Sequence, residues 1–335
     1  MHNKKKILFV LKKRSNYGVS YGLVNSCKFV ADALKSFGIE SKIVQVEDNN
    51  GIDREVTQYQ PTHCFIEALW VVPSKFEVLL PLHKKVEWFV RLHSQTPFLG
   101  YEGIAFEWIK GYVEISKKYK NFHVSSNSSM LVRDVEAALG IKMLYTPNIY
   151  LFDKKNYDFL WQDKTVDVGC FGAIRPFKNQ LNQALAALAF ANENKLKLRF
   201  HINASRFENQ GESILKNLRS IFKDTKHELV EHQWSNHEDF LNVVRQMDVG
   251  LQVSYTETFN IVAADFVSRH VPLVGSNEIE WLHPWYQADP NNVADIAKKL
   301  SFAYYAKVLH VHRLNESGLK NYNEKAIEAW LHIIK

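Results

Sequence analysis

Short apolar segments alternate with amphipathic segments along almost the whole chain, and this alternation restricts the fold more than any other feature of the sequence. Strands separated by helices form βαβ units, in which neighbouring strands are parallel and helices cover the sheet. The pattern therefore predicts an α/β protein. In the first half we predict strands at residues 7–11, 42–46, 62–69, 86–93, 122–125 and 142–145, and helices that end near Phe37 and span 102–115 and 128–139.

The alternation pauses at residues 146–164, which show no clear period, and then restarts. The second half has predicted strands at 166–171, 196–202, 228–232, 249–253 and 272–275, and predicted helices at 180–192, 212–222, 237–246, 261–269, 293–306 and 319–334. A chain of 335 residues exceeds what one core usually supports. We predict two Rossmann-like domains whose parallel sheets face each other across a cleft, with ligands at the carboxyl ends of the strands. The predicted segments are a first domain at 1–148, a linker at 149–164, a second domain at 165–312 and a helix at 313–335 that returns toward the first domain.

The excess positive charge lies entirely in the first half of the chain. Residues 1–150 contain 20 Lys and Arg against 14 Asp and Glu, whereas residues 151–335 contain 22 of each kind. A basic surface suits an anionic partner such as nucleic acid, lipid headgroups or an acidic glycan. The alternative is that this charge serves solubility alone.

Neither secretion nor membrane insertion is expected. The apolar run at residues 7–11 is shorter than the core of a signal peptide, and no run approaches the ~20 residues of a membrane span. Cys27, Cys64 and Cys170 are far apart and fit no disulfide or zinc spacing. A cytoplasmic location is therefore expected, with no stable membrane insertion.

The first motif with chemical meaning spans residues 172–180, between a predicted strand and a predicted helix. Gly172 lets the chain turn tightly. Arg175 and Lys178 are three residues apart, so both can reach one diphosphate, Arg through its planar fork and Lys as a point charge. The alternative is an exposed basic loop.

The second motif spans residues 255–265 and begins after another predicted strand. Glu257 lies in the turn, and Thr258 or Asn260 can cap the following helix, whose free N–H groups suit an anion. Asp265 comes eight residues after Glu257, about two helical turns, so both acids can face one ligand. The alternative is one capping acid and one solvated helix acid.

Together the two motifs resemble those of the retaining GT-B glycosyltransferases, in particular glycosyltransferase family 4. That family has a Gly-x-x-Arg-x-x-Lys loop at the start of its second domain and, later, Glu-x-Phe-Gly followed by a second Glu eight residues after the first. The matching residues here are Gly172, Arg175, Lys178, Glu257, Phe259 and Asp265. Asn260 replaces the usual Gly, and Asp265 replaces the usual Glu. The segment at 145–148 and the segment at 268–274 also resemble family segments.

The resemblance implies an enzyme that moves a sugar from a nucleotide-diphosphate donor, expected to be a UDP-sugar, with retention of anomeric configuration. It implies that Arg175 and Lys178 hold the diphosphate, that Glu257 contacts sugar hydroxyls and that Asp265 holds the ribose. No cofactor or metal is expected, since these side chains and a helix N-terminus would stabilise the leaving group. The full set of expected donor-binding residues is Gly172, Arg175, Lys178, Glu257, Thr258, Phe259, Asn260, Ile261 and Asp265.

His93 ends the strand predicted at 86–93 and would point into the cleft. In the resembled family a His near this place lies beside the transferred sugar, and the alternative is a hydrogen-bonded structural His. The expected catalytic set is therefore His93, Glu257, Arg175 and Lys178. The pair His310 and His312 lacks an evident third ligand and is not expected to bind a metal.

The acceptor is the least constrained part of the prediction. The segment at 91–99 also resembles glycosyltransferases encoded by phages and environmental viruses, some of which act on hydroxymethylated DNA bases. With the basic first half, this suggests 5-hydroxymethylcytosine in DNA as acceptor, in single or double strands. The expected acceptor contacts are Lys12, Lys13, Arg14, Arg91, Phe98 and Tyr101. The alternatives are surface polysaccharide or lipid-linked glycan synthesis, a non-catalytic nucleotide-sugar- or DNA-binding module, and a nucleotide-sugar epimerase.

Overall fold

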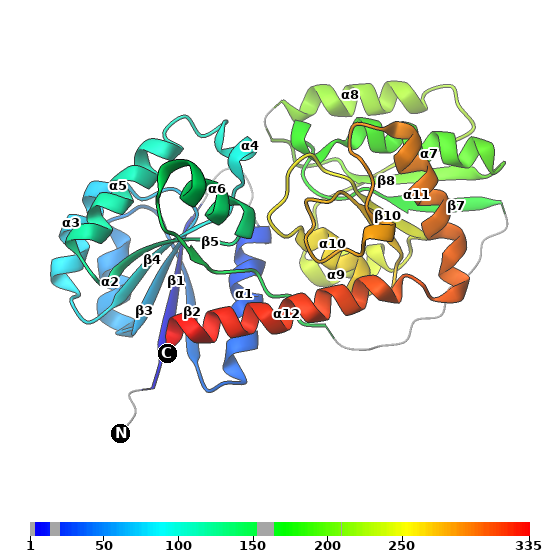
Figure 1. Cartoon of the computed structure of the whole chain (residues 1–335). Coiled ribbons are helices and arrows are strands. Elements are labelled where there is room, and N and C mark those ends of the chain that lie inside the picture. The colour runs from blue at the N-terminus through cyan, green and yellow to red at the C-terminus, as the bar shows by residue number, and fades with distance from the viewer. Residues whose placement is uncertain (1–3, 14–20, 153–163, 209) are drawn as a thin grey trace. The chain divides into compact units, whose positions relative to one another are not determined.

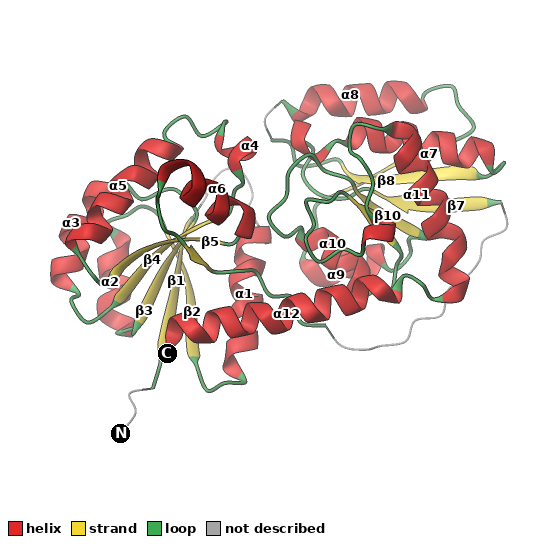
Figure 2. Cartoon of the chain, viewed as in Figure 1, coloured by secondary structure: helices red, strands yellow, loops and turns green. Residues whose placement is uncertain are grey.

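The computed structural model describes residues 4–13, 21–152, 164–208 and 210–335, and it divides into two compact units. Unit 1 comprises Met1–Leu151 and Asn323–Lys335, and unit 2 comprises Phe152–Tyr322 (Figure 1). Each unit contains one sheet in which every strand pairing is parallel, and helices connect the strands. The predicted α/β class is therefore confirmed (Figure 2). Most of the predicted linker at 149–164 lies outside the described residues.

Unit 1 contains a six-stranded sheet with the order β2-β1-β3-β4-β5-β6. The strand order reverses between β1 and β3, which is where an open α/β sheet of this kind usually binds its ligand. The strands are β1 (Lys6–Lys12), β2 (Glu40–Val46), β3 (His63–Glu67), β4 (Glu87–Leu92), β5 (Phe122–Ser126) and β6 (Leu144–Tyr145). The helices are α1 (Tyr21–Lys35), α2 (Gly51–Tyr59), α3 (Pro73–Leu82), α4 (Thr96–Leu99), α5 (Ala105–Lys118) and α6 (Ser129–Leu139).

The central strand β1 shows why this sheet is buried on both faces. Alternate side chains of a strand point to opposite faces. Leu8 and Val10 belong to the core cluster that also holds Phe76 from α3. Phe9 points to the other face, where it contacts the ring of Trp330 near the chain's C-terminus. Continuous apolar runs such as this one are typical of parallel strands covered by helices on both sides.

Three helices of unit 1 were not indicated by the sequence pattern. α2 and α3 complete the βαβ alternation between β2 and β4, and α4 is a single turn within the loop after β4. The apolar residues of α3 are interrupted by a serine, a lysine and a glutamate without a clear helical period, and its two prolines suggest a break in the chain. Pro73 lies at the start of the helix, where its missing N–H costs nothing. Pro81 lies one residue before the helix ends.

Unit 2 contains a five-stranded parallel sheet with the order β11-β10-β7-β8-β9. Its strands are β7 (Thr165–Gly169), β8 (Lys197–Asn203), β9 (Glu228–His232), β10 (Val249–Gln252) and β11 (Leu273–Gly275). Its main helices are α7 (Gln180–Glu193), α8 (Gly211–Phe222), α9 (His237–Val244), α10 (Ile261–Ser268) and α11 (Val293–Ala306). β7 and β10 have glycine at positions 169 and 250, which face α10. A Cβ at either position would lie less than 3 Å from the ring of Phe266 on α10. Small residues in the strands thus let α10 pack closely on the sheet.

The last helix, α12 (Arg313–Ile334), begins in unit 2, and its residues from Asn323 onward belong to unit 1. The side chain of Asn323 bonds to both the backbone N–H and the carbonyl of Tyr150. The indole N–H of Trp330 donates to the carbonyl of Pro147 at 2.8 Å, and its ring lies 4.9 Å from that of Phe65. The end of the chain is therefore an integral part of the core of unit 1.

Two buried histidines make stability dependent on pH. Burial, reinforced by the charge of Lys5, lowers the pKa of His63 to about 4. Burial, together with the electrostatic effect of His310, lowers the pKa of His312 to about 4. An unfolded His binds a proton below pH 6.5, whereas these folded ones remain neutral until about pH 4. The free energy of unfolding is therefore expected to fall as the pH drops from 6.5 to 4, by on the order of 3 kcal/mol per His.

Urea unfolding between pH 4 and 7.5 measures this effect. The His63→Gln variant is expected to have a flatter pH dependence than the wild type, because the substituted side chain binds no proton in the unfolded state. An equally steep profile in this variant would show that other groups cause the acid destabilisation.

Candidate active site

The loop that follows β7 in unit 2 takes the sharp turn expected of Gly172. This residue has φ of +117°, a conformation that a side chain would strain. Its N–H donates to Oδ1 of Asn203 at the end of β8, at 2.9 Å. A Cβ added at this glycine would lie 3.8 Å from Cε of Lys178, so the Lys178 side chain runs back across the turn. The turn therefore places a lysine at the carboxyl end of the sheet.

Lys178 and Glu257 meet at this edge although they are far apart in sequence. Lys178 ends a short 3₁₀ turn, Pro176–Lys178, and Glu257 follows β10, the neighbour of β7 in the sheet. Nζ of Lys178 lies 2.5 Å from Oε1 of Glu257, and both side chains are about nine-tenths buried. Two residues from the two predicted motifs are thus joined in one ion pair.

Asn260 fixes the start of α10 next to this pair. Its side-chain oxygen accepts from the N–H of Ala263 at 2.9 Å, so Asn260, and not Thr258, is the helix cap. Its amide also donates to Gln252 at 3.0 Å, and Gln252 donates to the carbonyl of Phe171 in the loop after β7. This chain of bonds holds the two motif loops together.

Arg175 lies in the same loop as Lys178 but turns toward a different acid. Its Nη1 lies 3.0 Å from Oε2 of Glu208, which also contacts Arg206. Burial opposes ionisation of Glu208, but the two arginines hold the pKa of this carboxyl below its ordinary value. Arg175 therefore has a fixed position at the rim of the loop, and about a quarter of its side chain remains exposed.

Two expected donor contacts are buried away from solvent. Asp265 is 1% exposed, and its Oδ1 lies 2.7 Å from Nε2 of His237 at the start of α9. Phe259 is 2% exposed and packs against Trp281 and Tyr322. The expected ribose contact of Asp265 stays a prediction, and in this structure its carboxylate contacts His237 inside unit 2. Phe259 likewise anchors the loop through its packing.

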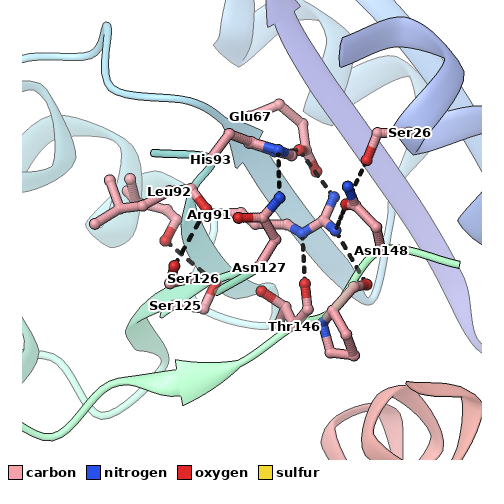
Figure 3. A network of polar contacts seen from close by, with 12 residues as sticks. Ser26, Glu67, Arg91, Leu92, His93, Ser125, Ser126, Asn127, Thr146 and Asn148 are labelled. Atoms are coloured by element: carbon pink, nitrogen blue, oxygen red, sulfur yellow. Dashed lines mark hydrogen bonds and ion pairs between the residues drawn. The ribbon is translucent and has the colours of Figure 1, made fainter. Parts of the chain in front are cut away.

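In unit 1, polar side chains gather at the carboxyl ends of β3, β4 and β5 (Figure 3). Arg91 is completely buried and opposes Glu67 in the register of β3 and β4. Its Nη1 lies 3.2 Å from Oε2 of Glu67, and its Nε donates to the carbonyl of Thr146 at 2.9 Å. Its Nη2 donates to the carbonyl of Pro147 and to Oδ1 of Asn148, at 3.1 and 2.7 Å.

His93 completes this cluster. Its Nε2 contacts Oε2 of Glu67, and its Nδ1 lies 3.3 Å from the side-chain amide nitrogen of Asn127 (Figure 3). Burial lowers the pKa of His93, and the positive charge of Arg91 adds to this against the influence of Glu67. The pKa of Glu67 is held below its ordinary value by Arg91 and His93 although burial opposes ionisation. The cluster therefore contains a neutral imidazole beside an ionised carboxylate.

The expected acceptor residues differ in exposure. Arg91 is completely buried, so its expected contact with an acceptor stays a prediction that this position does not favour. Lys12 is exposed, and Lys13 is exposed but paired with Glu47 at 2.5 Å. Phe98 is half-buried and Tyr101 is 54% exposed, with their rings 6.4 Å apart. Arg14 lies outside the described residues.

Several residues of these clusters were not identified from the sequence. They are Glu67, Asn127, Asn203, Glu208, His237 and Glu278. Burial, together with the negative charge of nearby Glu257, raises the pKa of Glu278. Glu67 had a usable signal, since an acid at the end of an otherwise apolar strand is buried and needs a partner. The others lie in loops or beside partners that become visible only when the strands are placed in a sheet.

Neither a metal centre nor a membrane span is found in the part of the chain that the structure describes. Within it, no three His, Cys, Asp or Glu side chains are grouped so that they can hold a metal ion. None of its helices is both long and apolar enough to cross a bilayer. Cys27, Cys64 and Cys170 are buried and free.

No protein-family model matches this chain, and no curated protein matches it in sequence. Solved structures do match it. A glycosyltransferase from Rickettsia africae ESF-5 has a TM-score of 0.71 and 14% identity, with 100% of this chain and 98% of that chain covered. A UDP-forming alpha,alpha-trehalose-phosphate synthase from Burkholderia xenovorans, in complex with glucose-6-phosphate, has a TM-score of 0.69 and 11% identity over 98% and 99%.

A third match is a mutant of S. aureus TarM in complex with Fondaparinux, alpha-GlcNAc-glycerol and UDP. It has a TM-score of 0.60 and 12% identity, with 81% of this chain and 55% of that chain covered. At these identities the likeness concerns the fold. The two-sheet α/β fold of this chain is that of the GT-B glycosyltransferases.

Proposed function

We propose that this chain is a glycosyltransferase whose unit 2 binds a nucleotide-diphosphate sugar. One observation carries the proposal: Lys178 and Glu257 form a nearly buried ion pair beside the Gly172 turn, at the carboxyl ends of the adjacent strands β7 and β10. Ligands of open α/β sheets bind at this edge. Similarity to a UDP-forming synthase and to a protein solved with UDP supports a UDP-sugar as the donor.

The chemistry requires charge stabilisation on both sides of the breaking bond. When the bond between the anomeric carbon and the diphosphate breaks, the electron pair leaves with the diphosphate. The acceptor oxygen forms the new bond to the anomeric carbon, and the proton of its hydroxyl would pass to the departing diphosphate. Lys178 and Arg175 would stabilise that negative charge, together with the N-terminus of α10. Glu257 would accept hydrogen bonds from sugar hydroxyls. We further propose that the anomeric configuration is retained, as the resemblance to family 4 implies.

The proposed acceptor is a hydroxyl group bound by unit 1. The basic excess of residues 1–150 favours an anionic acceptor, and 5-hydroxymethylcytosine in DNA is the specific hypothesis. The burial of Arg91 and the pairing of Lys13 leave fewer candidate phosphate contacts than the sequence suggested. An acceptor in polysaccharide or lipid-linked glycan synthesis is therefore the competing hypothesis.

A panel of UDP-sugars offered with hydroxymethylated DNA, glycan and lipid-linked acceptors tests both parts of the proposal. Mass spectrometry of the products identifies the sugar, the acceptor and, after purification for NMR, the anomeric configuration. Release of UDP without transfer to any acceptor, or absence of UDP-sugar binding, would contradict the proposed activity. Binding to a DNA duplex at about 50 and 200 mM salt tests the acceptor separately. Each phosphate contact adds about −0.9 to the slope of the logarithm of the binding constant against the logarithm of the salt concentration.

Activity is expected to persist in EDTA. Lys178, Arg175 and the N-terminus of α10 would provide the positive charge that a divalent cation supplies in other transferases. The measurement is turnover of the active donor and acceptor pair after dialysis against EDTA, compared with the same sample given Mg²⁺ or Mn²⁺. Complete loss that either cation reverses would contradict this assignment.

A further inference from the structure

The contact between Glu67 and His93 has a geometry that fixes which ring nitrogen carries the proton. Nε2 of His93 contacts Oε2 of Glu67, whose pKa lies below its ordinary value because Arg91 and His93 outweigh the effect of burial. An ionised carboxylate only accepts hydrogen bonds, so Nε2 must be the protonated nitrogen. Nδ1 of the neutral ring then carries a lone pair that can accept a hydrogen bond. In the structure the amide of Asn127 donates to it at 3.3 Å, which is long for a hydrogen bond.

The surroundings of Glu67 hold it in place and ionised. Arg91 contacts its Oε2 at 3.2 Å, and the buried thiol of Cys27 on α1 lies close enough that the carboxylate raises its pKa in addition to burial. Among the described residues, Oε1 of Glu67 has no hydrogen-bond partner although Glu67 is completely buried. A buried, ionised acid with one unused oxygen is costly for stability, which suggests a function beyond packing.

We propose that Glu67 is a positioning residue that holds His93 as the Nε2–H tautomer, so that Nδ1 accepts a hydrogen bond from a ligand hydroxyl. The hydroxyl takes the place of the Asn127 amide, and it belongs to the acceptor that unit 1 is proposed to bind. This inference rests on the proposed glycosyltransferase function for the identity of the ligand. The tautomer itself is a property of unit 1 and can be tested without any ligand.

The first experiment measures the tautomer directly. Long-range ¹H–¹⁵N spectra of the ¹⁵N-histidine-labelled full chain at pH 7 report the protonation of both ring nitrogens, and the His93→Gln variant identifies the His93 signals. We expect a neutral ring with the proton on Nε2. In the Glu67→Gln variant the pKa of His93 is expected to fall further, because a negative charge that favours the imidazolium is removed. A proton on Nδ1, or an unchanged pKa in Glu67→Gln, overturns the positioning role.

The second experiment measures the hydroxyl contact. Calorimetry gives the affinities of UDP and UDP-glucose for the wild type and for His93→Gln, whose amide can still donate to Glu67 and so preserve the fold. We expect KM for the acceptor identified by the panel to rise about five- to tenfold in His93→Gln, the effect of one hydrogen bond, while the affinities for UDP and UDP-glucose stay unchanged. A lower affinity for UDP-glucose with an unchanged KM for the acceptor would overturn the acceptor contact.

A matched control is present in the same unit. His123 on β5 contacts Glu87 on β4 at 2.9 Å, a second His–carboxylate pair but with both side chains about one-third or more exposed. His123→Gln is expected to leave both affinities and KM unchanged. Unchanged values in His93→Gln as well would overturn the hydroxyl contact while leaving the glycosyltransferase proposal intact. Failure of the wild type to bind UDP or UDP-glucose would instead contradict the proposed function, and the proposed hydroxyl contact would fail with it.

Discussion

Replacing Lys178 by alanine is expected to lower kcat by about 10²–10³-fold, because one electrostatic donor to a developing negative charge is worth ~2.7–4 kcal/mol in the transition state. Lys178 is the basic residue that the fold aims at the carboxyl edge of unit 2, 2.5 Å from Glu257. The substitution also removes the ion pair between Lys178 and the nearly buried Glu257, so some loss of stability is expected. Steady-state kinetics at saturating donor, together with urea unfolding, measure the two effects separately.

Two further substitutions show whether this effect is local. Arg175→Ala is expected to lower kcat by a similar factor with little loss of stability, because Arg206 still pairs with Glu208. Lys197→Ala, at the opposite end of the sheet on β8, is expected to change neither quantity, since its side chain is exposed. Near-normal turnover of both Lys178→Ala and Arg175→Ala would show that the donor diphosphate binds elsewhere.

Replacing Arg91 by alanine is expected to lower the free energy of unfolding by about 3–5 kcal/mol, the cost of breaking a buried ion pair. The substitution leaves the buried carboxylate of Glu67 without a cationic partner and removes the donor to the carbonyls of Thr146 and Pro147. It also removes the contact of the guanidinium with the ring of Trp330, 5.2 Å away. Urea unfolding followed by tryptophan fluorescence measures the effect.

A matched control shows whether the loss of stability is specific to the buried network around Arg91. Arg133→Ala on the exposed face of α6 is the matched control, and it is expected to change stability by less than about 0.5 kcal/mol. Combining Arg91→Met with Glu67→Gln is expected to recover part of the loss, because no unpaired charge then remains. An Arg91→Ala variant as stable as Arg133→Ala would show that the buried network contributes little to folding.

The fold was largely predictable because its signal is local. Strands such as β1 and β9 are short apolar or alternating runs flanked by turns, and helices such as α6 carry their own boundaries. Ser128 caps α6 by accepting from the N–H of Leu131, and Gly140 ends it in a left-handed conformation. α3 was missed because its apolar residues show no clear helical period and because it contains two prolines, which are unfavourable in most helix positions.

The candidate site was predictable only in part. The turn at Gly172, the position of Lys178 after it and the placement of Glu257 after β10 follow from the order of residues around two strands. The argument from helical spacing that Glu257 and Asp265 face one ligand does not apply, because it requires both acids to lie on one continuous helix. α10 begins at Ile261, so Glu257 lies in a loop and helical spacing does not relate the two acids. Asp265 faces His237 from within the helix instead.

The sequence alone determined that this chain forms parallel α/β units. It also determined that one basic motif and one acidic motif follow strands of the second unit. Those properties depend on residues that are close together in the chain, where periodicity and turn chemistry act directly. The tertiary structure decided which charged groups meet. Arg91 and Glu67 are 24 residues apart and become partners because β3 and β4 pair in a register that places them opposite each other. An arginine in isolation favours the surface, but a buried carboxylate and three backbone or amide oxygens around it provide enough partners to hold its charge inside the unit.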